Sequence, residues 1–316
     1  MRAGSTIPGN IRLLFAVMLC LSLFPPGPAN CLRLPAFQTA HLTVVHEPGI
    51  GGAARRLVKL YQSVKEELET FFKTQFVARP TIVILRAERF RAVSGTDPML
   101  IAYALPQTGT IVINLSALQR SEADLKTTLK HELCHLFLHA LAGGGHLPRW
   151  LDEGICQVVS GTLGDIMISL KGDPISEALR RGKLLKLKSI SKWFPSDRKS
   201  TLLAYAQSKA FVTFLINKYG KERLLEAVAL LRTNQVENAF ALAYGSRLDE
   251  LEASWHNTLR SKVSFLTTLS VYIYELLFVL GAILVALGFL RQRIRKKHAF
   301  QSEQHGSGFK TTRDFK

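Results

Sequence analysis

Hydrophobic and polar positions follow two different periods along this chain. Alternating or β-branched runs, which are typical of strands, occupy residues 41–46, 81–85 and 110–115. Apolar residues three and four positions apart predict helices over residues 53–72, 121–141, 148–161, 176–182, 201–219, 221–232, 235–244 and 247–262. Because the strands precede most of the helices, the pattern predicts an α+β fold, with an N-terminal mixed sheet and a mainly helical C-terminal half.

An apolar segment near the N-terminus lies outside this pattern. Residues 13–24 are mostly apolar, Arg2 and Arg12 precede them, and the small residue Ala29 follows a proline-rich stretch. The apolar core is too short to span a bilayer comfortably. With its basic start and small-residue end, it predicts a secretory signal peptide over residues 1–30. An uncleaved N-terminal anchor is the alternative.

A second apolar segment, residues 268–290, is long enough to cross a membrane. It has about 20 predominantly apolar residues, and five basic residues follow within residues 291–297. By the positive-inside rule, the basic tail of residues 291–316 is expected in the cytoplasm. Residues 31–264 then form an extracytoplasmic domain. The chain is thus predicted to be a single-pass cell-membrane protein that contacts lipid through residues 268–290.

The net charge of +17, from 41 Lys and Arg against 24 Asp and Glu, changes this picture little. The tail from residue 291 onward carries eight basic and two acidic residues, and Arg2 and Arg12 add two more positive charges. The remainder is spread along the middle of the chain, and its main cluster, between Arg180 and Lys188, is expected to be a solvated face. Without an RNA- or DNA-binding motif, this charge predicts no nucleic-acid partner. The four cysteines are too few for a disulfide-built miniprotein.

Residues 131–135, His-Glu-Leu-Cys-His, carry the candidate chemistry. Positions i and i+4 share one face of a helix, so His131 and His135 can present two imidazoles to one metal ion. Glu132 lies beside them, where it can reach a water on that metal, as in the HExxH pattern of zinc metallopeptidases. The expected helix follows a strand and has Ser121 near its N-terminal cap. The sequence therefore predicts a zinc (Zn2+) site.

A catalytic zinc site needs a third protein ligand and an open position for water. The candidates downstream of the motif are His139, His146, Asp152 and Glu153. His139 is four residues after His135, but three histidines in line on one helix match a tetrahedral site poorly. A metzincin would have its third histidine at position 141, which is Leu here. Asp152 and Glu153 begin the next predicted helix, which a glycine loop can fold back onto the first.

The two motifs HELCH and PRWLDEGIC together resemble the thermolysin-like gluzincin zinc metallopeptidases of the MA clan, and most closely the bacterial peptidase MA-like domain proteins. The resemblance covers roughly residues 40 to 260 and implies a zincin-type catalytic domain that hydrolyses protein or peptide substrates. It implies that His131, His135 and Glu153 bind zinc and that Glu132 is the general base. Tyr205 is the residue it suggests for oxyanion stabilisation.

The sequence departs from thermolysin at Gln157, where an Asp would orient one of the histidines. Residues 110–114 are expected to form a sheet edge that pairs with extended substrate, or else an ordinary interior strand. Cys134 and Cys156 are expected to be small core residues rather than metal or redox ligands, and Trp150 is expected to pack in the core.

The function predicted from these features is a membrane-anchored zinc peptidase whose catalytic domain lies outside the cytoplasm. One alternative is a catalytically silent relative that keeps the fold as a binding or scaffold module. A structural membrane protein in which HExxH occurs by chance is a further one. Measuring metal content would distinguish the structural membrane protein from the other two possibilities. Turnover of an unfolded protein would distinguish the active peptidase from the silent relative.

Overall fold

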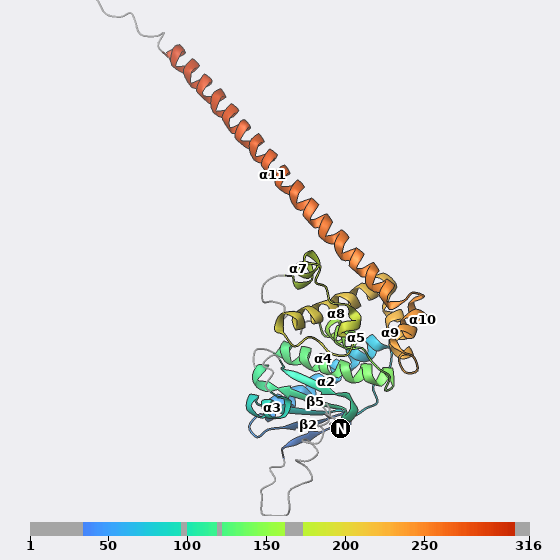
Figure 1. Ribbon diagram of the computed structural model, residues 1–316. Helices are drawn as coiled ribbons and strands as arrows, with labels where there is room; N and C mark the ends of the chain where they lie inside the picture. Colours follow the sequence, from blue (N-terminus) through green and yellow to red (C-terminus); the bar gives the residue numbers. More distant parts are fainter. Residues whose placement is uncertain (1–33, 96–99, 119–121, 162–172, 307–316) are drawn as a thin grey trace, which may run out of the picture. The chain divides into compact units, whose positions relative to one another are not determined.

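The computed structural model describes residues 34–95, 100–118, 122–161 and 173–306 (Figure 1). The chain divides into two compact units, Met1–Trp255 and His256–Lys316. The first unit holds the sheet and most of the helices, and the second continues the last helix. The predicted signal peptide, residues 1–30, and the predicted cap Ser121 lie outside the described residues.

A five-stranded mixed sheet forms the N-terminal part of the first unit. Its strands are β1 (Ala36–Gln38), β2 (Thr43–His46), β3 (Thr81–Leu85), β4 (Ala102–Leu105) and β5 (Thr110–Asn114). Their order in space is β1-β2-β3-β5-β4. The three middle strands are parallel, and the two edge strands, β1 and β4, are antiparallel to their neighbours. A mixed sheet followed by helices agrees with the predicted α+β fold.

The strand expected at the sheet edge is in fact interior. Thr110–Asn114 pairs with β3 on one side and with β4 on the other, so the expectation of an edge at residues 110–114 was wrong. The chain reverses through a single 3-10 turn, Pro106–Thr108, and Gly109, whose φ of 61° suits glycine. This reversal folds β4 back along β5, with Leu105 opposite Thr110. β4 was missed because Ala-Tyr-Ala-Leu contains no β-branched residue.

Helices cover both faces of the sheet, as the alternation of side chains along a strand requires. On one face Val83, Leu85 and Val112 pack with Phe90 of α3 (Ala87–Ser94). The other face, which carries the fully buried Ile82 and Ile113, is turned toward the longer helices (Figure 1). These are α2 (Gly51–Phe72) and α4 (Glu122–Ala142).

The helical half of the first unit packs around a group of aromatic side chains. Its helices are α5 (Arg149–Ser160), α7 (Pro174–Arg180), α8 (Arg198–Tyr219), α9 (Lys221–Leu230), α10 (Val236–Tyr244) and the start of α11 (Leu248–Gly306). Trp150 is fully buried, and its ring centroid lies 5.4 Å from that of Phe211 and 5.7 Å from that of Phe240. Phe211 in turn contacts Trp255 at 5.5 Å. Such pairs add about 0.5–1.5 kcal/mol each beyond the area they bury. Trp150 therefore packs in the core, as predicted.

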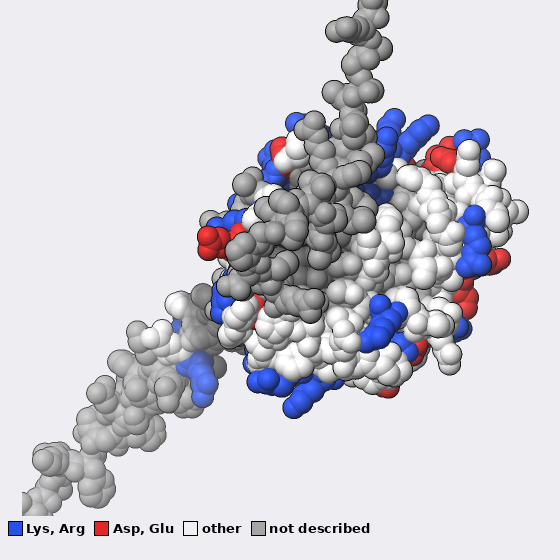
Figure 2. Space-filling view, turned by 90° about the horizontal axis from the view of Figure 1, so that it is seen from below, with Lys and Arg blue, Asp and Glu red and all other residues white. Residues whose placement is uncertain are grey.

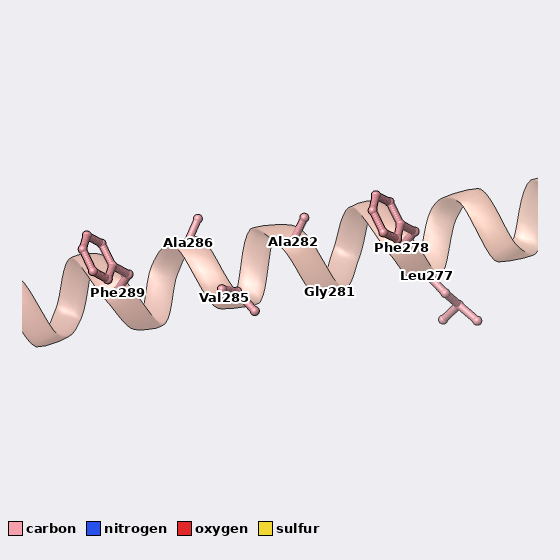
Figure 3. A pocket seen from close by; sticks show the side chains of 7 residues that line it. All are labelled: Leu277, Phe278, Gly281, Ala282, Val285, Ala286 and Phe289. Atoms are coloured by element: carbon pink, nitrogen blue, oxygen red, sulfur yellow. The ribbon is translucent and has the colours of Figure 1, made fainter.

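The second unit is the distal part of α11. The helix predicted over residues 247–262 and the apolar segment that follows form one continuous helix, since no Gly or Pro separates them. Glu275–Arg293 is long and apolar enough to cross a membrane, and none of this span is buried within the structure. Phe278, Ala282, Ala286 and Phe289 line one side of a shallow hollow on its surface (Figure 3). All the side chains that line this hollow are hydrocarbon, as suits contact with lipid tails.

Candidate metal centre

α4 and α5 run antiparallel, and their facing sides form the candidate site. Three contacts show the direction, because they step up one helix and down the other: His139 with Asp152, His135 with Cys156, and His131 with Ser160. A glycine-rich turn joins the two helices. A Cβ on Gly145 would lie 1.8 Å from the carbonyl oxygen of Leu231, so the turn has no room for a side chain there.

Three donor atoms from the two helices converge on one point. Nε2 of His131 lies 3.3 Å from Nε2 of His135, and Oε2 of Glu153 lies 3.6 Å and 3.9 Å from these two nitrogens. Around a tetrahedral zinc ion with bonds of about 2.0–2.1 Å, neighbouring ligand atoms are about 3.3–3.5 Å apart. The set of two imidazoles and one carboxylate therefore fits zinc both in chemistry and in spacing.

The opposite nitrogens of the two rings are held by other side chains. Nδ1 of His135 lies 2.7 Å from Oδ1 of Asp152, and Nδ1 of His131 lies 3.4 Å from Oγ of Ser160. The second carboxylate oxygen of Asp152 is 3.4 Å from Nε2 of His139. Partners of this kind fix the ring orientation of metal-binding histidines. Asp152 and His139 were both considered as third ligands from the sequence. They lie on the Nδ1 side of His135, away from the point where Nε2 of His131 and Nε2 of His135 converge.

Glu132 follows His131 on α4, and its side chain is buried in the same site. Burial raises the pKa of its carboxyl group, and the nearby carboxylates of Glu153 and Asp152 act in the same direction. The two imidazoles oppose that rise. A raised pKa makes the carboxylate a stronger base, which suits a group that accepts a proton from water.

The site holds more acidic than permanently basic groups. Burial alone would raise the pKa of Glu153, but His131, His135 and the guanidinium of Arg149 keep that pKa below its ordinary value. Burial would lower the pKa of His135, yet Asp152 and the other carboxylates raise it well above its ordinary value. Three carboxylates, Glu132, Asp152 and Glu153, thus face one arginine in a buried space, which favours a bound cation.

Tyr205 and Arg149 lie on the other side of Glu153. An Arg149 nitrogen is 3.7 Å from Oε1 of Glu153, the carboxylate oxygen not shared with the histidines. The Tyr205 hydroxyl interacts electrostatically with Arg149, and the charge of Glu153, together with burial, raises the pKa of Tyr205. The ring of Phe194 packs under the guanidinium at 5.0 Å and edge-on to Tyr205 at 4.9 Å. Tyr205 therefore stays protonated as a hydrogen-bond donor beside the donor set.

Cys134 and Cys156 are both free and buried, as expected of small core residues. The thiol of Cys156 lies 3.4 Å from Nδ1 of His135 and 4.0 Å from Asp152, so these three could also hold a metal. Burial and the neighbouring Cys134 raise the pKa of Cys156 well above its ordinary value, however, which keeps the thiol protonated. In addition, Nδ1 of His135 is already engaged by Asp152. The two histidines with Glu153 are therefore the better metal site.

The position of α5 depends on its close approach to α8. A Cβ on Gly154 would lie 2.6 Å from the carbonyl oxygen of Ser208 and 2.7 Å from a methyl of Val212, so only glycine allows this packing. Gln157, at the point where thermolysin has an Asp, does not reach a histidine. Its amide nitrogen donates to the carbonyl oxygen of Tyr205 at 3.3 Å and ties the two helices together.

The structure brings together the five residues that the sequence and its resemblance assigned to the site: His131, Glu132, His135, Glu153 and Tyr205. His146, a further candidate ligand, lies exposed in the turn. Sequence reasoning missed Arg149 and Ser160, and it gave Asp152 only as a rival ligand. Arg149 precedes Glu153 by four positions, a spacing that places two side chains on one helix face and could have indicated the pair.

The sequence profile described as the Peptidase MA superfamily matches residues 101–261. No curated protein matches the sequence. Among solved structures, aminopeptidase A of Legionella pneumophila in complex with aspartic acid is 15% identical over 71% of this chain and 27% of its own, with a TM-score of 0.41. The E323A mutant of an M1 zinc metallopeptidase from Deinococcus radiodurans is 13% identical over 70% of this chain and 50% of its own, with a TM-score of 0.35. The chain thus spans half or less of each structure.

Proposed function

The chain belongs to the Peptidase MA superfamily, and we propose that it is a membrane-anchored zinc peptidase. One observation carries the proposal: Nε2 of His131, Nε2 of His135 and Oε2 of Glu153 converge beside the buried carboxyl of Glu132. Zinc held by those three residues would supply Lewis acidity, which lowers the pKa of water and polarises a peptide carbonyl.

Glu132 is proposed as the general base. It accepts a proton from the attacking water and passes it to the leaving amine, as a buried carboxyl with a raised pKa can do. Asp152 is proposed as a positioning residue. By accepting a hydrogen bond from Nδ1 of His135, it keeps Nε2 deprotonated and directed at the metal.

Tyr205 is proposed to donate a hydrogen bond to the oxyanion that forms on the substrate. Its raised pKa, and its electrostatic interactions with Glu153 and Glu132, support this role. Arg149 interacts with both Tyr205 and Glu153 and is proposed to fix the hydroxyl of one and the carboxylate of the other.

An extended peptide is proposed to bind along β4. β4 is an edge strand, with its backbone paired to β5 on one side, and it packs against α4, the helix that carries Glu132. A substrate strand added at this edge would gain main-chain hydrogen bonds without requiring any one side chain.

The membrane anchor is proposed to be the apolar part of α11. Residues 1–30 would be a signal peptide, residues 31–264 the extracytoplasmic peptidase domain, residues 268–290 the span and residues 291–316 a cytoplasmic tail. Support comes from Glu275–Arg293, which is long and apolar enough to cross a membrane. Protease protection of intact spheroplasts tests the orientation: a tag after Lys316 should be protected while the first unit is digested. The reverse pattern would contradict it.

Zinc analysis and cleavage of a peptide library by the full chain in detergent test the catalytic proposal. Glu132→Gln should lower kcat/KM by about 10²–10⁴-fold or more while zinc stays bound, because Glu132 acts as base and not as ligand. Glu237→Gln, a change at an exposed surface carboxylate, is the matched control and should leave turnover unchanged. Zinc bound without turnover in the unmodified chain would instead favour a silent binding module.

A further inference from the structure

The segment from the last residue of α7 to the first turn of α8 carries much of the chain's positive charge. Residues 180–199 contain eight Lys and Arg and one Asp, a net of +7 in a chain of +17. All eight basic residues are exposed. The sequence predicted a solvated face for part of this segment, and the exposure of its cations agrees with that.

Hydrogen bonds and buried side chains fix the backbone of this segment to the helical half. Gln207, fully buried on α8, accepts a hydrogen bond from the backbone nitrogen of Leu185 at 2.9 Å and donates one to its carbonyl oxygen at 3.0 Å. Leu187 and Ile190, in the 3-10 turn η3 (Leu187–Ile190), point into the core. The cations between and beside them, Lys186, Lys188 and Lys192, therefore point outward from a fixed backbone.

The two ends of the segment meet, so its charges form a compact surface. Lys199, in the first turn of α8, lies 3.1 Å from Glu177 of α7, and Arg181 lies 3.2 Å from the same carboxylate oxygen. Among the described residues, these are the two of the eight cations that have a carboxylate within ion-pair distance. The remaining six have no carboxylate within ion-pair distance in the described part of the chain, so their charge is open to water and to binding partners.

One exposed aromatic side chain lies among these cations. Trp193 is 55% exposed, whereas Trp150 and Trp255, the other tryptophans of the chain, are 0% and 2% exposed. A solvated face explains exposed lysines but not an exposed tryptophan. By contrast, on the described part of the face drawn in Figure 2, Lys and Arg lie in small separate groups, with Asp and Glu near several of them.

We propose that residues 180–199 dock on the surface of an anionic lipid bilayer, with Trp193 at headgroup level. Tryptophan favours the membrane interface because it is apolar with one polar end, and lysine and arginine are attracted by anionic headgroups. The bilayer is the partner favoured because the same chain carries its own candidate span, Glu275–Arg293. The inference rests on the membrane anchor proposed above.

Docking of this segment would also place the candidate metal centre beside the bilayer. The carbonyl oxygen of Ser191 accepts a hydrogen bond from the backbone nitrogen of Arg149 at 2.7 Å. Phe194, next to Trp193, packs against both Arg149 and Tyr205. The docking segment is thus continuous with the wall of the site, and the substrate class it favours is polypeptide that lies at the membrane surface.

Tryptophan fluorescence of the full chain in nanodiscs tests the proposal. With brominated anionic lipid, the emission of Trp193 should be quenched, while Trp150 and Trp255 are shielded by burial. Brominated zwitterionic lipid, or anionic lipid at high salt, should give little quenching. Trp193→Phe should remove the quenched component, which assigns the signal to that residue.

The triple change Lys186→Gln, Lys188→Gln and Lys192→Gln should abolish the quenching without preventing insertion into the discs. The matched control, Arg56→Gln, Lys59→Gln and Arg89→Gln, changes three exposed cations elsewhere on the first unit and should leave it intact. If the chain inserts into anionic discs but Trp193 is not quenched, the docking proposal is overturned while the anchor stands, and an acidic polypeptide becomes the partner to examine. Equal quenching in zwitterionic discs would also overturn the docking proposal. Failure of the chain to enter the discs would overturn the anchor, and this inference with it.

Discussion

The metal centre between α4 and α5 and the basic segment of residues 180–199 are both rich in charged side chains. The two regions differ in whether those side chains are buried and paired. In the metal centre, the charged side chains are largely buried and two of the three carboxylates are paired: Asp152 lies against His135, and Glu153 against Arg149 and His131. In the segment, all eight cations are exposed and six have no carboxylate partner among the described residues.

The difference indicates what each region is for. Removing one member of a buried, paired set leaves a charge that neither water nor a partner stabilises, so such changes are expensive and affect function first. Removing one exposed cation changes little, because water already stabilises it. A region that keeps unpaired charge at the surface is suited to binding by summed attraction, and one that keeps paired charge in the interior is suited to holding an ion.

The largest expected effect is on metal affinity. Glu153→Ala removes one of the three converging donor atoms, whereas Asp152→Ala removes the partner of a ligand, which typically lowers metal affinity by about 10–100-fold. We therefore expect Glu153→Ala to weaken zinc binding well beyond Asp152→Ala, as measured by competition with a chelating dye. The opposite ranking would move the third ligand to Asp152 and place the metal on the other side of His135.

The next effect tests the packing that sets the site. Gly154→Ala places a Cβ 2.6 Å from the carbonyl oxygen of Ser208, so α5 must move away from α8. We expect a loss of about 1–3 kcal/mol in the free energy of unfolding, with weaker zinc binding because Glu153 moves too. Gly52→Ala is the matched control: a Cβ there meets nothing within 4 Å, so stability should be unchanged or slightly higher. Equal stability of the two variants would show that α5 is not held this tightly.

The sequence predicted which side chains come together between α4 and α5 better than it predicted the strands of the sheet. The spacing of His131 and His135 on one helix follows from helical periodicity, and the resemblance supplied Glu153 and Tyr205. β4 has no β-branched residue and β1 has three residues, so neither leaves a clear period. The position of Asp152 behind His135 depends on how α5 is rotated against α4. The close contact of Gly154 with α8 fixes that rotation, and no local sequence pattern predicts this contact.

A smaller effect concerns pH. Burial alone would raise the pKa of Asp152, but His135 and His139 hold that pKa below its ordinary value. The contribution of Asp152 to stability is therefore present above its unfolded-state pKa of about 3.9 and is lost as pH falls through the folded-state pKa. The pKa of His135 is raised, so its contribution is complete below about pH 6.5 and is lost as pH rises through the folded-state pKa. Chelator-treated protein should therefore gain most from this pair between about pH 4 and 6.5. Calorimetry should give a flatter profile for Asp152→Asn, and an unchanged profile would contradict the coupling.

The smallest effect is expected from Lys188→Gln in the basic segment. Lys188 is exposed on η3, so its removal should change the free energy of unfolding by no more than about 0.5 kcal/mol. Zinc affinity and hydrolysis of a short soluble peptide should also stay the same, because the change lies outside the paired groups around His135. Thermal unfolding at low and high salt is the measurement. If the change lowers the free energy of unfolding by more than about 1 kcal/mol, and high salt removes that loss, Lys188 has a charged partner within the domain. The charge of the segment would then be paired, as in the metal centre, and would not be free to dock on a bilayer.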